Sequence, residues 1–152
     1  MQQNIFGCVE GAQSYYLAKY SVIGKPIIYL SRNDVELKHV ASGLLLFEPN
    51  AEVYSLPAWD CVPYDRLSPH GDITGERIST LSKLASRDLS DKKVIILLTI
   101  NSFLQKIPPK SFFSNASLLL KKGYQYNLSQ ITSFLEDSGF NRTNTVREYG
   151  EY

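Results

Sequence analysis

The segment Lys93–Thr99 constrains the fold of this chain more than any other. Its core, VIILL, is apolar at every position, so both faces of an extended strand would have to be buried. Such a strand is typical of the centre of a parallel sheet between layers of helices. Two further strand-like segments, Ile27–Leu30 and Glu52–Leu56, precede it, and helical patterns separate them. Strands that alternate with helices predict crossover connections, and therefore an α/β fold with a parallel sheet and flanking helices.

Helix signals surround these strands, because apolar residues recur there at helical spacing. The pattern predicts helices over Ala12–Tyr20, from a cap at Ser31 or Asn33 to Pro49, over Asp72–Leu84, and over Ser102–Lys106. We expect Asn101 to cap the last of these, since a short polar side chain can accept a bond from a free N–H of the first turn. In the helix over Asp72–Leu84, the residues expected to face inward are Ile73, Ile78, Leu81 and Leu84.

The pattern changes after Pro109. Strands are predicted over Ser117–Lys121 and Val146–Tyr152, on either side of a helix that starts at Asn127 or Leu128 and is stopped by Gly139. This unit has no fourth element to cover it. We therefore expect an α/β domain over residues 1–115 and the incomplete start of a small α+β domain over residues 116–152. The open strand edges of the second part would favour a homodimer through this unit.

Composition narrows the class of protein. The chain has 152 residues, of which 43% are hydrophobic and 20% charged, as in soluble globular proteins. Sixteen basic and 15 acidic residues leave a net charge of +1, which argues against autonomous nucleic-acid binding. The two cysteines, Cys8 and Cys61, are too few for a disulfide framework. The sequence shows no membrane-length apolar run and no signal peptide, so we expect a cytoplasmic protein without a membrane partner.

The segment Gly7–Ser14 resembles a phosphate-binding loop, G-x-x-x-x-G-K-[ST], at the start of a helix. Its first and last positions match, but Ala12 stands where the second glycine belongs and Gln13 where the lysine belongs. A neutral amide cannot replace the lysine charge at the phosphates, and no acidic Mg²⁺-binding box follows Val94–Leu98. We therefore predict a degenerate loop that binds no nucleotide, and no cofactor. The loop residues are Gly7, Gly11, Ala12, Gln13 and Ser14.

The two histidines do not predict a metal or catalytic site. His39 has no partner at ligand spacing. His70 lies near Cys61, Asp65 and Asp72, but these residues do not form the short regular pairs of a zinc site. Ser68, His70 and Asp65 are too close along a proline-rich loop to form a catalytic triad. We expect instead that Asp72 caps the next helix and that His70 hydrogen-bonds the loop.

An irregular stretch before this helix carries the most distinctive pattern of the chain. Prolines there preclude a regular strand or helix, and the aromatic residues are expected to be anchors packed under the loop. We call Trp59–Arg77 the signature segment. Its defining residues are Trp59, Pro63, Tyr64, Asp65, Ser68, Pro69, His70, Asp72 and Arg77.

This order of residues resembles the N-terminal region of the bacterial transcription-repair coupling factors, whose members carry Trp-(Asp/Glu)-x-x-Pro-Tyr-Asp-x-x-Ser-Pro-His-x-Asp-Ile before a helix with Arg-Ile/Leu-Ser-Thr-Leu. The resemblance continues through Lys121-Lys122-Gly123 and Asp137–Phe140 to Glu148–Tyr152. It therefore covers nearly the whole chain.

The resemblance implies a module similar to the nucleotide-binding part of the repair protein UvrB, with a degenerate loop. The whole protein of this family recognises stalled RNA polymerase, translocates on DNA with ATP and recruits UvrA. No motor lies in these residues, so the chain is expected to be a protein-interaction and regulatory module and not an enzyme. Its implied partners are UvrA and the other domains of the same protein; RNA polymerase and DNA would be reached only through missing domains.

Two alternatives stay open at this stage. One is a nucleotide-binding domain that uses a divergent phosphate loop. The other is a DNA-binding module that uses the aromatic loop from Trp59 to His70, although Asp60, Asp65 and Asp72 reduce its positive charge.

Overall fold

The structure is a computed structural model that describes residues 4–9, 11–61, 68–86, 90–115, 118, 120–148 and 150–152. The chain divides into two compact units. The first unit comprises Met1–Ala58 and Arg87–Gln105, and the second comprises Trp59–Ser86 and Lys106–Tyr152. Each unit is described by itself below.

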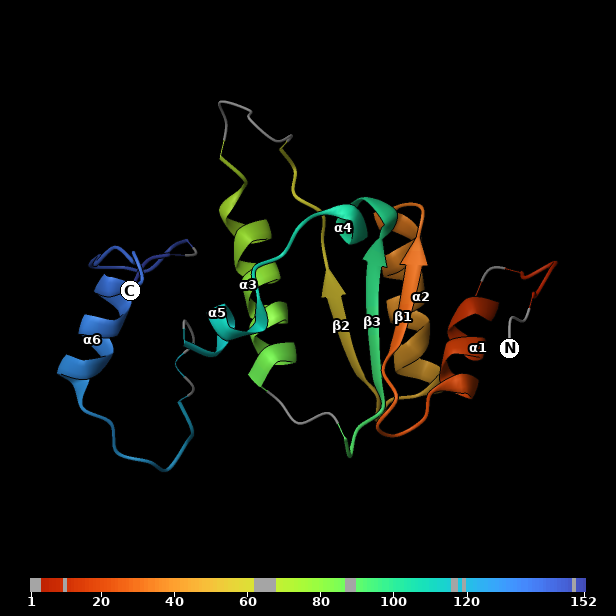
Figure 1. The fold of residues 1–152 in the computed structure, drawn as a ribbon, viewed down its shortest axis with the longest axis horizontal. Helices are drawn as coiled ribbons and strands as arrows, with labels where there is room; N and C mark the ends of the chain where they lie inside the picture. Colours follow the sequence, from red (N-terminus) through yellow and green to blue (C-terminus); the bar gives the residue numbers. More distant parts are fainter. Residues whose placement is uncertain are drawn as a thin grey trace. The chain divides into compact units, whose positions relative to one another are not determined.

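The first unit contains a three-stranded parallel sheet in the order β1-β3-β2 (Figure 1). The strands are β1 (Ile27–Ser31), β2 (Glu52–Leu56) and β3 (Val94–Thr99). In the register of the sheet, Leu97 of β3 pairs with Tyr29 on one side and with Ser55 on the other. The apolar segment thus forms the central strand of a parallel sheet, and the predicted α/β class is confirmed.

Helices accompany this sheet in the same unit. They are α1 (Ala12–Tyr20), α2 (Asp34–Phe47) and the short α4 (Ile100–Leu104). Helix α2 lies behind the sheet in Figure 1 and contacts β1 and β3, and α1 packs on α2. Asn33 caps α2, since its side chain accepts a bond from the Glu36 N–H at 2.9 Å. The predicted Asn33 cap and the predicted bounds of the first helix are confirmed.

The core of the first unit lies between α2 and one face of the sheet. Complete burial of one large apolar side chain in such a core stabilises the fold by about 1.5–3 kcal/mol. The other face of β3 is buried as well, at Val94 and Leu98, as expected for a central strand. The core cluster consists of Leu37, Val40, Leu44, Ile95 and Leu97.

The second unit is helical in its described part. It contains α3 (Gly71–Ser86), α5 (Lys110–Asn115) and α6 (Leu128–Asp137), and α3 contacts α5. Asn127 caps α6 by accepting from the Ser129 N–H at 3.0 Å, and Gly139 takes a left-handed conformation with φ of 84° just beyond its end. The predicted start and stop of this helix are confirmed.

Two helix predictions were wrong in detail. On α3, Ile78 is 46% exposed, whereas Arg77 and Thr80 are buried. The other residues predicted to face inward, Ile73, Leu81 and Leu84, are half-buried, so the predicted stripe is wrong at Ile78. The cap of α4 is Thr99 and not Asn101, because the Thr99 hydroxyl accepts from the Ser102 N–H at 3.2 Å. The helix accordingly begins at Ile100.

Helix α5 was not predicted, because Pro108 and Pro109 indicated only the end of the preceding helix. In the structure the Pro109 carbonyl accepts a hydrogen bond from the Phe112 N–H at 3.0 Å.

The strands predicted over 117–121 and 146–152 are not formed in the described part of those ranges. The C-terminal residues instead make a single parallel bridge, Asn141 with Glu151, supported by the bond from Asn141 N–H to the Gly150 carbonyl at 2.7 Å. The polar sequence of this segment offers no apolar face that would extend the bridge into a strand. Among the described residues, no helix combines the length and the apolar character needed to cross a membrane.

Candidate functional site

The Gly7–Ser14 loop keeps the backbone of a turn before a helix. Gly7 and Gly11 are left-handed, with φ of 70° and 88°, a conformation that favours glycine. Gly11 stands at the cap of α1 without a side-chain hydrogen bond to the helix. The described residues before the loop, 4–6, form no strand. The loop therefore leads into a helix as predicted, but it does not follow a strand of the sheet.

Ser14, at the position of the metal-binding hydroxyl of a phosphate loop, has a structural role here. Its side chain is 0% exposed, and its hydroxyl donates to the Val40 carbonyl of α2 at 3.0 Å. Gly43 allows the close approach of the two helices, since a Cβ there would lie 2.4 Å from Ser14 Oγ. The hydroxyl is thus used to hold α1 against α2.

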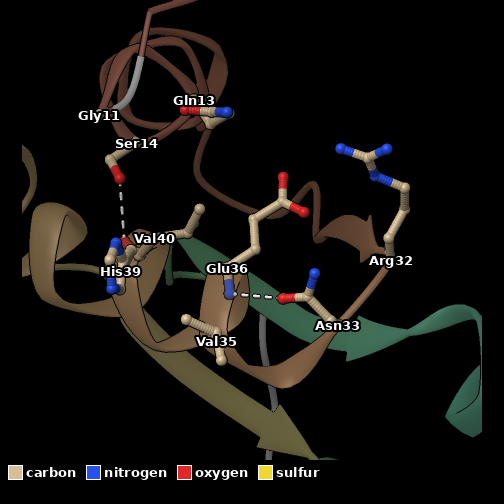
Figure 2. A pocket seen from close by; sticks show the side chains of 9 residues that line it. All are labelled: Gly11, Gln13, Ser14, Arg32, Asn33, Val35, Glu36, His39 and Val40. Atoms are coloured by element: carbon tan, nitrogen blue, oxygen red, sulfur yellow. Dashed lines mark hydrogen bonds between the residues drawn. The ribbon is translucent and has the colours of Figure 1, made fainter.

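A pocket of about 450 Å³ lies beside this loop, between the start of α1 and the start of α2. In Figure 2 the amide of Gln13 and the side chains of Arg32 and Glu36 lie around the same space. Gln13 thus lines a pocket at the position of the lysine of a phosphate loop. The pocket combines one guanidinium with one carboxylate and is not uniformly positive. Its lining residues are Gly11, Gln13, Ser14, Arg32, Asn33, Val35, Glu36, His39 and Val40.

The carboxylate of Glu36 is fixed in this pocket by two hydroxyl groups. Ser31 donates to Oε2 and Tyr29 to Oε1, each at 2.8 Å. These two bonds, that from Ser31 first, hold the pKa of the Glu36 carboxyl below its ordinary value. Burial, and then the bond to Glu36, raises the pKa of the Tyr29 hydroxyl to about 12. Glu36 therefore presents a negative charge to any ligand of the pocket near neutral pH.

The signature segment lies in the second unit. The guanidinium of Arg77 lies 4.5 Å from the ring centroid of Trp59, within the range of a cation–π interaction. Arg77 is 1% exposed, and burial lowers the pKa of its guanidinium. Trp59 is half-buried. Trp59 and Arg77, the first and last residues of the segment, are thus brought together.

His70 rather than Asp72 occupies the start of α3, which corrects the predicted cap. The His70 carbonyl accepts from Thr74 N–H at 3.1 Å, and its ring Nδ1 accepts from Asp72 N–H at 3.3 Å. The His70 N–H in turn donates to the Asp60 carboxylate at 3.3 Å. Asp72 falls in the first turn because the helix begins at Gly71. The predicted role of His70 in hydrogen bonding the loop is present in this structure.

The structure describes only some of the other residues of the signature segment. Pro63, Tyr64 and Asp65 lie outside the described residues, while Ser68 is exposed and Pro69 half-buried. Within the described ranges, no group of three or more His, Cys, Asp or Glu side chains could hold a metal ion.

The sequence analysis missed the cluster of Tyr29, Ser31 and Glu36. Its signal was the spacing Asn33-x-x-Glu36, a capping-box pattern in which the glutamate would reach back to the cap residue. In the structure Asn33 caps the helix as that pattern predicts, but the Glu36 side chain binds Ser31 and Tyr29.

Several transcription-repair-coupling factors are similar to this chain. The transcription-repair-coupling factor of Rickettsia conorii is 31% identical over 125 residues, or 82% of this chain and 11% of that protein. That of Escherichia coli is 32% identical over 100 residues, or 66% of this chain and 8% of that protein. That of Haemophilus influenzae is 34% identical over 122 residues, or 80% of this chain and 10% of that protein.

No family model matches the chain. The chain spans only about a tenth of the length of the curated relatives it matches. At this identity over most of the chain, it belongs to the transcription-repair-coupling factor family and corresponds to one segment of those longer proteins.

Proposed function

We propose that this chain is a protein-interaction and regulatory module that helps to link stalled RNA polymerase to nucleotide excision repair through UvrA, with no nucleotide chemistry of its own. The similarity to transcription-repair-coupling factors over about 80% of the chain supports the process. The buried Ser14 hydroxyl is the observation that supports the absence of nucleotide chemistry, because Ser14 is 0% exposed and its hydroxyl is directed at the Val40 carbonyl of α2.

The charges of the pocket support the same conclusion. Gln13 supplies no positive charge, and the Glu36 carboxylate would repel a polyphosphate. Of the residues that line this pocket, Arg32 alone carries a full positive charge that would attract a nucleotide.

The chain is expected not to bind ATP with useful affinity. Isothermal titration with ATP and Mg²⁺ checks this, and a dissociation constant in the low micromolar range, roughly −8 kcal/mol of binding free energy, would contradict it. The Ala12→Gly/Gln13→Lys double variant restores the loop sequence and is still expected not to bind, because Ser14 and Glu36 are unchanged. A dissociation constant for ATP in the low micromolar range in that variant would show that Ala12 and Gln13 alone prevent binding in the parent chain.

Binding to UvrA tests the interaction role. With UvrA immobilised, we expect weak, saturable binding of the chain that a full-length member of the family competes away, since the resemblance assigns the UvrA surface largely to the small domain begun by residues 116–152. Two exposed leucines give a matched pair of variants: Leu128→Ala in α6 should weaken binding more than Leu46→Ala in α2. Binding that is absent, or that competitor does not displace, would refute the proposal for this chain.

Three related predictions belong to the same proposal. The boundary between the α/β domain and the small domain would lie near residues 115 and 116. A homodimer would form, if at all, through residues 116–152. The protein would act in the cytoplasm, where transcription and repair meet in bacteria.

A further inference from the structure

Strand β1 is an edge strand of the sheet in the first unit. It pairs with β3 on one side, and among the described residues no strand pairs with its other side. An open edge presents a row of backbone N–H and C=O groups that can pair with another extended segment. Such an edge therefore has the hydrogen-bonding groups needed for strand addition.

An apolar pocket of about 300 Å³ lies beside this edge, between α1 and β1. Tyr16 and Tyr20 of α1 stack with their ring centroids 6.4 Å apart, and β1 contributes Ile27 and Tyr29. The Tyr29 hydroxyl is bonded to Glu36, so its ring remains as apolar lining. The pocket could take an apolar or aromatic side chain, not a charged one. It is lined by Ile5, Cys8, Gln13, Tyr16, Leu17, Tyr20, Ile27 and Tyr29.

The opposite face of β1 carries two exposed apolar side chains. Ile28 is 56% exposed and Leu30 is 44% exposed, and both alternate along the strand with Ile27 and Tyr29. A strand added at this edge would send alternate side chains to the two faces. One set would enter the pocket beside α1, and the other would cover Ile28 and Leu30.

We propose that the open edge of β1 binds an extended polypeptide segment that is apolar on both faces and carries acidic residues at its ends. The ligand must be extended, because the backbone groups within a helix are already hydrogen-bonded and cannot pair with the edge. Its side chains must be apolar on both faces, because the pocket beside α1 and the surface at Ile28 and Leu30 are both apolar. The acidic ends follow from Lys25 and Arg32, which are exposed on either side of β1. This inference is independent of the proposed UvrA role.

The same charges disfavour a second copy of this chain as the occupant. A second β1 strand would bring another Lys25 and Arg32 to this edge, and no acidic residue within Ile27–Ser31 to pair with them. A segment with acidic ends instead places opposite charges near both residues.

The test uses the whole chain and a fluorescein-labelled peptide, Asp-Val-Ile-Ile-Leu-Leu-Thr-Glu, which carries the sequence of β3 between acidic residues. We expect saturable binding by anisotropy. Ile28→Lys, on one face of the edge, and Tyr20→Lys, in the pocket, should each weaken it about tenfold or more, whereas Leu46→Lys, an exposed apolar site on α2, should change it by less than about twofold. The added lysines attract the acidic peptide, so weakening cannot come from net charge.

Amide exchange on the same samples locates the bound peptide. Exchange in β1 should slow by about tenfold or more on binding, with α2 unchanged. Absence of saturable binding, or equal weakening by Leu46→Lys, would overturn the proposal. A concentration-dependent dimer that Ile28→Lys abolishes would also overturn it, since it would assign the edge to a second copy.

Discussion

Arg77→Ala is expected to destabilise the second unit by about 2–5 kcal/mol, the range for large-to-alanine substitutions at buried sites. Arg77 is the largest fully buried side chain of the described residues, so truncation leaves a cavity and removes the cation over the Trp59 ring. Long charged side chains contribute packing as well as charge. Thermal unfolding followed by circular dichroism should show a lowered Tm, by roughly 2–4 °C per kcal/mol.

Arg77→Lys is the matched control, because lysine keeps the charge and loses the planar group that stacks on the ring. The Tm of Arg77→Lys should lie between the Tm of the parent chain and that of Arg77→Ala. If Arg77→Ala melts within a degree or two of the parent, Arg77 does not anchor the signature segment, and a role in contacting a partner becomes the better explanation of its place in the pattern.

Gly43→Leu is expected to separate α1 from α2 at a cost of about 3 kcal/mol or more, at the upper end of the range for overpacking. Even the first added carbon would lie 2.4 Å from Ser14 Oγ and 2.7 Å from Ser14 Cβ. The helix-propensity gain of up to about 1 kcal/mol over glycine cannot offset this overlap. Urea unfolding measures the cost, and Ser42→Leu, at the exposed neighbouring position, should change stability by less than about 0.5 kcal/mol.

A double-mutant cycle isolates the contact between the helices. Gly43→Ala and Ser14→Gly should each destabilise the chain, and the pair together should cost about 1–3 kcal/mol less than the sum, because the glycine at position 14 makes room for the new methyl group. Strict additivity would show that the helices relax apart without resistance and that their close approach is not required.

The sheet could be predicted because its signals are local and redundant. The VIILL run requires burial on both faces whatever surrounds it, and Pro49 with the Asn33 cap delimits α2 from within its own sequence. The second unit was harder to predict. The apolar stripe expected on α3 included Ile78, but the buried position is held by Arg77, and no helical periodicity predicts that a charged residue will be buried over an aromatic ring.

The candidate site shows the same limit. Loss of the lysine at Gln13 is visible in the sequence, so the degenerate character of the loop could be proposed. The use of the Ser14 hydroxyl could not, since it depends on Gly43, 29 positions along the chain, bringing α2 close to α1. The Glu36 cluster depends likewise on a strand and a helix that meet only after folding.

The pairing of Arg77 with Trp59 gives the chain a built-in optical reporter. Trp59 is the sole tryptophan among 152 residues, so indole emission comes from the signature segment alone, while the tyrosines of the first unit remain silent under selective excitation. Emission would therefore follow the second unit, while circular dichroism follows the secondary structure of the whole chain. Coincident transitions would indicate one cooperative unit, and an early shift of emission would show that the second unit opens while the parallel sheet is still folded.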